Sequence, residues 1–267
     1  CHTPMRYAWD LTHRYLKEGG LTRGLKGSFA RAILHYIRLW DVAAANRVDH
    51  FVANSRYAAR RIWRAYRREA TVIYPPVDVE RFQVREKKED FFLFVSRLVP
   101  YKKADLVVAA FTDLGLPLYV AGDGPQFEAC RKVAGKNVRF LGYQDDAAVA
   151  DLMARARALV FAAEEDFGIV PLEAQACGTP VIAYGKGGVR ETVVAADGAN
   201  WDEATGFFFP EQTPAALAAA VQQFLAWEGR FRPEVLRRNA ERFSRERFRR
   251  EIAAFVSSKS GLKLIDL

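Results

Sequence analysis

The sequence predicts an α/β fold in which a parallel β-sheet is covered by helices. Short, continuous apolar runs such as residues 91–96 and 158–163 are typical of strands that are buried on both faces. Around the second run the chain gives the order strand, turn, helix, strand within about thirty residues, which defines a βαβ unit. Ligands of such sheets bind beyond the carboxyl ends of the strands. We therefore look for function in the turns that follow the apolar runs.

The composition is that of a globular protein with a basic balance. The chain has 267 residues, half of them apolar, which is enough for one large core or two modest ones. Forty Lys and Arg against 32 Asp and Glu give a net charge of +8. This charge suits polyanionic partners such as diphosphates, anionic lipid surfaces or nucleic acid. No apolar run approaches the roughly twenty residues that a membrane-spanning helix needs.

The cysteines indicate the compartment. Cys1, Cys130 and Cys177 have neither paired nor metal-like spacing, so we expect no metal site. An odd, low count is typical of the reducing cytoplasm, where we place the protein. Cys177, near a predicted helix end, is interpreted as small core filler.

Residues 1–74 are predicted to form a partial domain. The chain opens without Met on a turn-like stretch that an apolar strand would ordinarily precede, so we expect a fragment of a longer protein. In this stretch Arg6, Trp9 and Asp10 either line a cleft or anchor the following helix. Residues 11–27 mix charges with glycines and are predicted to form a mobile loop. The helix expected over residues 28–46 has a stripe typical of core packing, formed by Ile33, Ile37, Trp40 and Ala44.

A short strand over residues 49–54 is expected to lead into a basic helix over residues 55–68, with Asn54-Ser55 as its N-cap. The simpler interpretation of this helix is a buried stripe with a solvated basic face. The alternative is that the basic face rests on anionic lipid headgroups at the inner side of the membrane. We do not expect nucleic acid as a partner, because no motif for it is present. The basic face consists of Arg56, Arg60, Arg64 and Arg67.

After a strand over residues 71–74, Pro75-Pro76 makes a stiff joint at which we place a domain boundary. The charged run 85–90 is interpreted as an exposed connection. A second domain is then predicted over residues 75–240. Its expected strands cover residues 91–96, 118–122, 138–143, 158–163, 181–184 and 206–209, and its expected helices include 126–134, 147–154 and 214–227.

Two cations follow the first strand of this domain. Arg97 comes directly after it, and Lys102 lies five residues later near a helix start. Such a pair beside a helix N-terminus can clamp a diphosphate, because Arg offers a planar fork and Lys a compact charge. The simpler alternative is ordinary surface cations. Lys103 is a neighbouring cation to which we assign no role.

Glycine turns follow two later strands. In Gly122-Asp123-Gly124 the glycines either let the backbone approach a ligand or simply form a tight strand-to-helix connection. The pair Gly187-Gly188 precedes a helix expected to open at Glu191, and such loops can bind anions with their amides.

The stretch from Glu165 to Glu173 combines two acids with a helix start. Unpaired amides at Gly168, Ile169 and Val170 would point out of the helix N-terminus, which favours an anion such as phosphate. Carboxylates beside an anion are better suited to accept hydrogen bonds from neutral hydroxyl groups of the same ligand. A sugar phosphate or nucleotide sugar offers both chemistries. The simpler interpretation is that Glu173 favours the helix dipole and Glu165 is a solvated turn acid.

The order and spacing of these motifs resemble retaining family-four glycosyltransferases, over Phe51 to about residue 256. The matching stretches are Ser96-Arg97-Leu98-Val99-Pro100-Tyr101-Lys102-Lys103, Ala121-Gly122-Asp123-Gly124-Pro125, Glu165-Asp166-Phe167-Gly168 through Glu173-Ala174, Gly178-Thr179-Pro180-Val181-Ile182-Ala183 and Gly187-Gly188-Val189-Arg190-Glu191. The resemblance implies a GT-B fold, with two Rossmann-like domains, of which the N-terminal one is partial here. It also implies that residues 241–267 hold a helix that crosses back to the N-terminal domain.

The resemblance further implies roles for single residues. Arg97 and Lys102 would neutralise the departing nucleotide, and Tyr143 would lie in the segment that holds the base. A histidine of the N-terminal domain contacts the donor sugar in the family; His2 either matches it or caps a turn. Catalytic roles fall to Glu165, His2, Arg97 and Lys102. The expected donor contacts are Arg97, Lys102, Gly122, Gly124, Tyr143, Glu165, Phe167, Gly168, Ile169, Val170 and Glu173.

The expected function is transfer of a hexose from a nucleoside diphosphate sugar to a polysaccharide or lipid-linked acceptor, with retention of configuration and without a metal or cofactor. The stretch from His2 to Asp10 resembles mannosyltransferase-like members, which suggests GDP-mannose as the donor. The alternative is a fragment that binds nucleotide sugars without turnover, because part of the acceptor side is missing.

Overall fold

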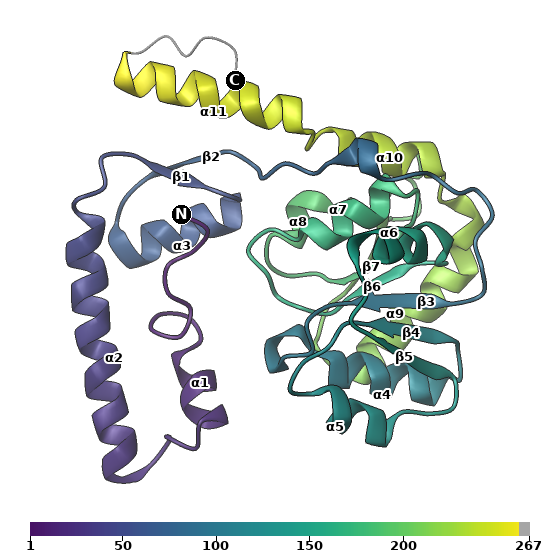
Figure 1. The fold of residues 1–267 in the computed structure, drawn as a ribbon, viewed down its shortest axis with the longest axis horizontal. Coiled ribbons are helices and arrows are strands. Elements are labelled where there is room, and N and C mark those ends of the chain that lie inside the picture. The colour runs from purple at the N-terminus through teal and green to yellow at the C-terminus, as the bar shows by residue number, and fades with distance from the viewer. Residues whose placement is uncertain (262–267) are drawn as a thin grey trace. The chain divides into compact units, whose positions relative to one another are not determined.

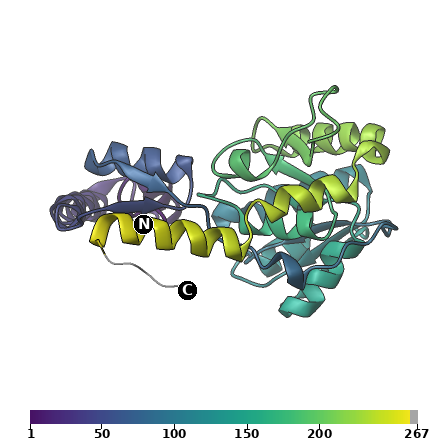
Figure 2. The ribbon, with the colours of Figure 1, turned by 90° about the horizontal axis from the view of Figure 1, so that it is seen from above.

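The computed structural model describes residues 1–261, and the chain divides into two compact units, Cys1–Tyr74 and Pro75–Leu267. Figure 1 shows both units as ribbons, and Figure 2 shows them from above.

The first unit is built around a small βαβ motif. Strands β1 (Phe51–Ala53) and β2 (Ala70–Val72) pair in parallel, with Phe51 opposite Ala70. Helix α3 (Arg56–Tyr66) connects them and begins at the predicted N-cap, where the Ser55 side chain accepts a hydrogen bond from the amide of Ala58. Helices α1 (Thr12–Glu18) and α2 (Gly24–Ala45) precede the motif. The buried core cluster of this unit consists of Ala45, Phe51, Ala53, Ala58 and Ile62.

Two predictions for this unit are wrong. Residues 11–27 do not form a loop, because they contain α1 and the start of α2. Gly20 and Gly24 have positive φ; Gly20 lies between the two helices, and Gly24 begins α2. Gly27 lies inside α2, where a Cβ would come within 2.6 Å of the Leu21 carbonyl oxygen. The expected core stripe of α2 is not buried either, since Ile33 and Trp40 are exposed.

Polar side chains tie the opening segment to the helices. The Trp9 indole and the Tyr66 hydroxyl both donate hydrogen bonds to Oδ2 of the buried Asp41, at 2.8 and 2.7 Å. Arg61, also buried, forms an ion pair with Asp10. Trp9 and Asp10 therefore anchor the following helices, as the second interpretation of these residues predicts.

The second unit is a doubly wound sheet of six parallel strands in the order β5-β4-β3-β6-β7-β8. Helices α4, α5 and α9 cover one face, and α6, α7 and α10 cover the other (Figure 1). The strands are β3 (Phe92–Val95), β4 (Leu118–Ala121), β5 (Val138–Gly142), β6 (Leu159–Phe161), β7 (Val181–Tyr184) and β8 (Gly206–Phe209). The helices are α4 (Ala104–Leu114), α5 (Phe127–Val133), α6 (Asp146–Arg155), α7 (Ile169–Ala176), α8 (Val189–Thr192), α9 (Pro214–Trp227), α10 (Pro233–Glu241) and α11 (Arg245–Ser260).

Most predictions for the second unit are confirmed. The bounds of β7, β8 and α9 match the sequence interpretation. The helix expected over residues 147–154 is present as α6, which begins one residue earlier, and the Asp145 side chain caps it by accepting a hydrogen bond from the amide of Ala148. Cys177 is fully buried as expected, and burial raises the pKa of its thiol to about 12. Glu191 does not open a helix, because it lies inside α8. The run 85–90 is not uniformly exposed either, since the Lys88 ammonium donates to the Ala154 carbonyl and to the Thr179 hydroxyl.

Candidate functional site

The order of the strands fixes where the candidate site lies. From β3 the chain adds β4 and β5 on one side of the sheet and then β6, β7 and β8 on the other. The order therefore reverses between β3 and β6, and ligands of doubly wound sheets bind outside the carboxyl ends of the strands at such a switch point. Arg97 and Lys102 follow β3, and Glu165 follows β6. The fold itself thus puts the predicted cations and the first predicted acid at the switch point.

An ion pair joins the two sides of this point. The Lys102 ammonium contacts Oε1 of Glu165, and their side chains are 19% and 21% exposed. Lys102 ends a short 3-10 helix, Pro100–Lys102, directly before α4. Arg97 is exposed, and within residues 1–261 its side chain has no hydrogen-bond or ion-pair partner. A partly buried ion pair, together with an exposed guanidinium that follows the same strand as Lys102, is suited to a ligand that carries both hydroxyl groups and negative charge.

The turn that carries Glu165 is held from the next strand by Gly187 and Gly188. Gly187 bridges to Glu165, and the Gly188 amide donates to the Glu165 carbonyl oxygen at 2.8 Å. A Cβ on either glycine would overlap backbone atoms of the turn. The sequence predicts only an anion-binding loop here, although the glycine pair after the neighbouring strand is a signal of close backbone packing. These glycines support the turn that carries the candidate acid.

The start of α7 has the geometry expected of an anion-binding helix end. Gly168 is the N-cap, with φ of +96°, a conformation that favours glycine. Ile169 and Val170 occupy the first turn, whose amides have no partner within a helix. The Phe167 ring is buried and packs edge-on against Phe243, with ring centroids 5.7 Å apart. Phe167 can therefore contribute its backbone, but not its ring, to a donor contact.

Glu173 lies in the second turn of α7, among charged groups other than Lys102. Burial raises the pKa of its carboxyl group, Arg81 opposes the increase, and Asp146 adds to it. Arg81 in turn donates to Asp146 at 2.9 Å. The two predicted acids therefore have different electrostatic surroundings. Glu165 is paired with a cation, whereas Glu173 is desolvated and is suited to accepting hydrogen bonds from neutral groups.

The structure gives packing reasons for two of the remaining predicted donor contacts, Gly122 and Gly124, but not for Tyr143 and His2. A Cβ on Gly122 would overlap the Ser96 carbonyl oxygen, and one on Gly124 would lie 2.6 Å from the Leu98 carbonyl oxygen. Close packing of two backbone turns thus accounts for both glycines without a ligand. Tyr143 follows β5 and is 80% exposed. His2 is exposed and belongs to the first unit, so its contact with a donor sugar stays a prediction.

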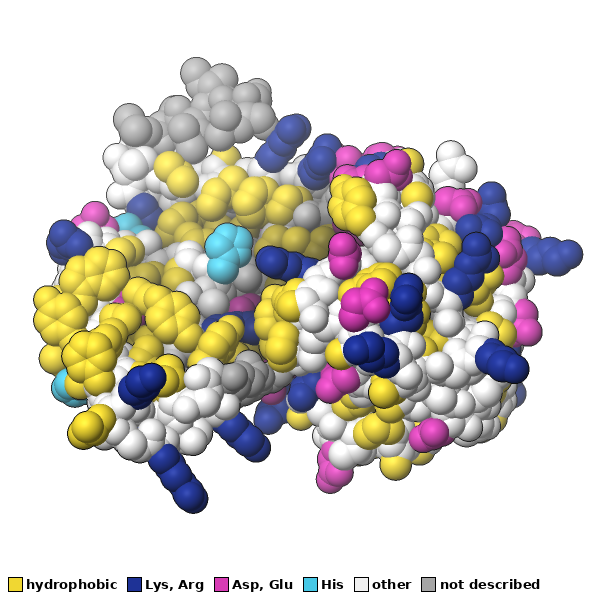
Figure 3. Space-filling view, turned by 60° about the horizontal axis from the view of Figure 1, so that its bottom comes forward, with side chains coloured by type: hydrophobic (Ala, Val, Ile, Leu, Met, Phe, Trp, Pro, Cys, Tyr) yellow, Lys and Arg dark blue, Asp and Glu magenta, His cyan; other side chains and the backbone are white. Residues whose placement is uncertain are grey.

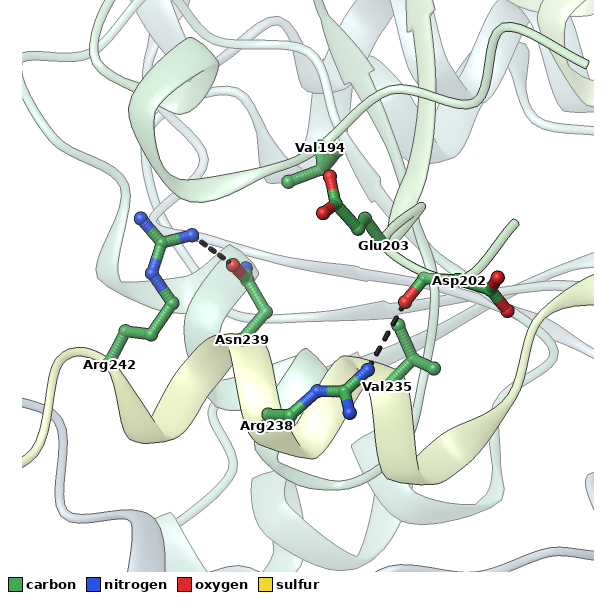
Figure 4. A pocket seen from close by; sticks show the side chains of 7 residues that line it. All are labelled: Val194, Asp202, Glu203, Val235, Arg238, Asn239 and Arg242. Carbon is green, nitrogen blue, oxygen red and sulfur yellow. Dashed lines mark hydrogen bonds between the residues drawn. The ribbon is translucent and has the colours of Figure 1, made fainter. Parts of the chain in front are cut away.

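A groove of about 440 Å³ lies elsewhere in the second unit, between α10 and the chain that leads into β8 (Figure 4). None of the predicted donor contacts lines it. Because the chain there enters β8 at its amino end, the groove is away from the switch point. The lining residues are Val194, Asp202, Glu203, Val235, Arg238, Asn239 and Arg242.

Over residues 1–261, no group of three or more His, Cys, Asp and Glu side chains is arranged to hold a metal ion. In the same part of the chain, every helix is too short or too polar to cross a lipid bilayer.

Comparisons with known proteins give a consistent picture. A profile of the family described as Glycosyl transferases group 1 matches residues 77–243. A D-inositol 3-phosphate glycosyltransferase of Geodermatophilus obscurus is 33% identical over 237 residues, covering 74% of this chain and 50% of that protein. A GDP-mannose-dependent alpha-(1-6)-phosphatidylinositol dimannoside mannosyltransferase of Mycobacterium tuberculosis is 35% identical over 159 residues, covering 57% and 39%. The chain thus spans about half the length of these relatives, or less.

Solved structures agree in fold. Sucrose-phosphate synthase from Thermosynechococcus elongatus matches with a TM-score of 0.72 at 24% identity, covering 84% of this chain and 61% of that one. Anabaena HepE in complex with UDP-glucose matches with a TM-score of 0.71 at 21% identity, covering 88% and 76%. Both are GT-B glycosyltransferases, so the predicted α/β fold of GT-B type is confirmed.

Proposed function

The chain belongs to the glycosyl transferases group 1 family. On this premise we propose that it is the donor-binding part of a retaining hexosyltransferase of family four. The donor is a nucleoside diphosphate sugar, and the acceptor is a polysaccharide or lipid-linked glycan. The observation that carries the proposal is the Lys102–Glu165 ion pair, because it joins the two sides of the switch point. A cation beside a carboxylate that can accept hydroxyl hydrogen bonds matches the chemistry of a sugar phosphate.

Each residue has one task in this proposal. Arg97 and Lys102 hold the diphosphate, and Lys102 then lies between the phosphate and Glu165. Glu165 and the first amides of α7 hold the sugar, His2 contacts it from the first unit, and Glu173 accepts hydrogen bonds from the ribose hydroxyls. A desolvated acid suits that last task, because burial strengthens its hydrogen bonds to neutral groups.

The transfer itself needs little covalent chemistry from the protein. The acceptor oxygen forms a bond to the anomeric carbon on the face that the leaving group occupies, while the bond from that carbon to the phosphate oxygen breaks. The acceptor proton passes to the departing phosphate. Placement of the reactants and neutralisation of the leaving charge by Arg97 and Lys102 supply the acceleration. The proposal includes no metal or cofactor.

Mannose from a guanosine donor is our proposal for the sugar. It rests on the resemblance of residues 2–10 to mannosyltransferase-like proteins, and the M. tuberculosis relative described as GDP-mannose-dependent supports it. The solved Anabaena structure contains UDP-glucose instead, so the choice of base requires a direct comparison.

We further propose that the protein works in the cytoplasm and contacts the inner face of the membrane through α3. The four arginines of the predicted basic face, Arg56, Arg60, Arg64 and Arg67, are all exposed. The Arg67 guanidinium lies over the Trp63 ring at 4.3 Å, and that ring is itself half exposed. An exposed tryptophan among arginines suits an interface of headgroups and acyl chains.

The experiment is titration calorimetry with GDP and UDP, together with a donor-hydrolysis assay. Arg97→Ala is expected to weaken binding by about 1.5–3 kcal/mol, the range for hydrogen bonds to charged groups. Lys136→Ala is the matched control, because Lys136 is exposed and precedes β5, at the opposite end of the sheet. If the wild-type protein binds neither nucleotide, the proposal is overturned; if Arg97→Ala binds as wild type does, Arg97 is not in the site.

A second candidate function is nucleotide-sugar binding without turnover. The observation that favours it is that the sheet of the first unit has two strands in the described chain, whereas that of the second unit has six. Binding with neither hydrolysis nor transfer in the same assay would select this candidate.

A further inference from the structure

A buried pair of amide side chains joins α7 to α10 on the side away from the switch point. Gln175 on α7 is fully buried, and Asn239 on α10 nearly so. The Asn239 amide nitrogen donates to the Gln175 side-chain oxygen at 2.6 Å and to the Thr192 carbonyl oxygen at 2.9 Å. The Gln175 amide nitrogen donates to the carbonyl oxygens of Pro171 and Thr192, both at 3.0 Å. Figure 4 shows Asn239 on α10, with its oxygen accepting from Arg242.

This network allows only one orientation of each amide. Gln175 faces two carbonyl oxygens, so its NH₂ group must point to them and its oxygen must accept from Asn239. Arg242, which can only donate, sets the orientation of Asn239 in the same way at 2.9 Å. The Gln175 and Asn239 amide groups are buried and fully partnered, whereas Arg242 reaches Asn239 from the surface. An unpaired amide in such a buried position would be costly. The network therefore holds α7, α10 and the end of α8 together through hydrogen bonds whose donors and acceptors cannot be exchanged.

The carbonyl groups at its ends belong to the two segments that form the candidate site. Pro171 is in the first turn of α7, next to Ile169 and Val170. Thr192 ends α8, which begins directly after Gly187 and Gly188, the glycines that hold the Glu165 turn. Apolar side chains could fill the same volume, but they could not hold two carbonyl groups at one point.

We propose that Gln175 and Asn239 are positioning residues that set the spacing between the first turn of α7 and the glycine loop before α8. This inference rests on the proposed function, because the spacing matters only if both segments contact one donor. Neither residue lies at the switch point, and their effect on the donor passes through backbone position. A displacement of about 1 Å in such an arrangement can cost up to about a hundredfold in rate.

Asn239→Leu tests the inference, because leucine is similar in size and forms no hydrogen bond. Val221→Ala is the matched control: Val221 is fully buried on α9, which covers the other face of the sheet, and its truncation also destabilises the unit. Nucleoside diphosphate affinity and the donor-hydrolysis rate are measured well below the unfolding midpoint of each variant. We expect both variants to unfold at lower temperature, but only Asn239→Leu to lose about tenfold or more in affinity or rate.

If Asn239→Leu binds and reacts as Val221→Ala does, the pair has a purely structural role and the inference is overturned. Asn239→Ser, which keeps one donor, is measured by the same criteria if the leucine variant does not fold, and an intermediate loss is expected. Failure of the proposed function is recognised separately, because the wild-type protein would then bind neither GDP nor UDP.

Discussion

The two units differ in how far their apolar side chains are buried and in their net charge. In the second unit, both faces of a six-stranded sheet are covered by helices, and large residues such as Phe92, Phe111 and Phe224 are fully buried. In the first unit, α2 exposes a row of large apolar residues, among them Leu25 at 91%, Phe29 at 70% and Tyr36 at 71%. Figure 3 shows apolar side chains gathered on the surface of this unit, at the left of the view.

The charge is divided just as unevenly. Residues 1–74 hold fourteen Lys and Arg against five Asp and Glu, a net charge of +9, and residues 75–267 hold 26 against 27, a net charge of −1. The net charge of the chain was interpreted as suiting diphosphates among other polyanions. The division shows that the unit with the candidate diphosphate site is close to neutral. That site depends on two placed cations, whereas the excess charge belongs to the surface of the first unit.

The contrast predicts that substitutions in the closely packed second unit cost more stability than those on the surface of the first unit. We expect the largest loss from Gly188→Ala in the second unit. The new Cβ would overlap the Asp166 carbonyl oxygen and push away the turn that carries Glu165. We expect the free energy of unfolding to fall by about 3 kcal/mol, the upper part of the usual range for overpacking. Nucleoside diphosphate affinity should fall as well. Gly229→Ala is the control, because a Cβ there meets no atom within 4 Å. Equal unfolding midpoints for the two variants would show that the loop does not support the turn.

A smaller effect is expected from Lys88→Met, which tests how the second unit stabilises a buried cation. The Lys88 ammonium donates to the Ala154 carbonyl and the Thr179 hydroxyl, both at 2.8 Å, and to the Cys177 carbonyl at 3.3 Å. It therefore lies at the carboxyl ends of α6 and α7, where a positive charge is favourable. Removing these hydrogen bonds should lower the free energy of unfolding by about 1–2 kcal/mol.

The same variant has a defined pH dependence. Burial, assisted by Arg85, lowers the pKa of Lys88 from 10.5 to about 8. Between these two values the unfolded chain binds more protons than the folded one, so the contribution of Lys88 to stability rises with pH over this window. Denaturant unfolding at pH 7 and pH 10 should therefore show a larger difference between wild type and Lys88→Met at pH 10. Lys87→Met, at the exposed neighbouring position, is the matched control.

The second unit was more predictable than the first for a physical reason. Strands buried on both faces give continuous apolar runs, and Gly178, Pro180 and Pro214 mark element ends, so β7, β8 and α9 were placed correctly. In the first unit the stripe containing Ile33 and Trp40 has helical spacing, but the spacing only shows that the two side chains share a face. It cannot show whether another element covers that face.

The sequence predicts those parts of the candidate site that follow strand ends. It does not predict the contacts between residues that are far apart in the chain. Arg97, Lys102 and Glu165 follow strand ends, so the parallel topology was enough to bring them to one edge. The contact of Gly188 with Asp166 and the hydrogen bond between Gln175 and Asn239 join segments 22 and 64 residues apart. Lys88 was missed because its charged neighbours suggested an exposed run. For the Gly188 contact the sequence offers only the glycine pair itself, and for the Gln175–Asn239 hydrogen bond and the burial of Lys88 it offers no signal.

The smallest expected effect is on the first unit and follows from its excess charge. Arg64→Ser removes one exposed cation from α3, and each cation near an anionic bilayer contributes about 1 kcal/mol. Sedimentation with vesicles that contain anionic lipid should therefore show roughly fivefold weaker binding at low salt. Arg249→Ser is the control, because Arg249 is exposed on α11 of the second unit. Equal losses for both variants would mean that total charge, and not the face of α3, governs the contact. No binding by the wild type would remove the membrane from the proposal and leave the exposed apolar row of α2 as the feature of this unit to be explained.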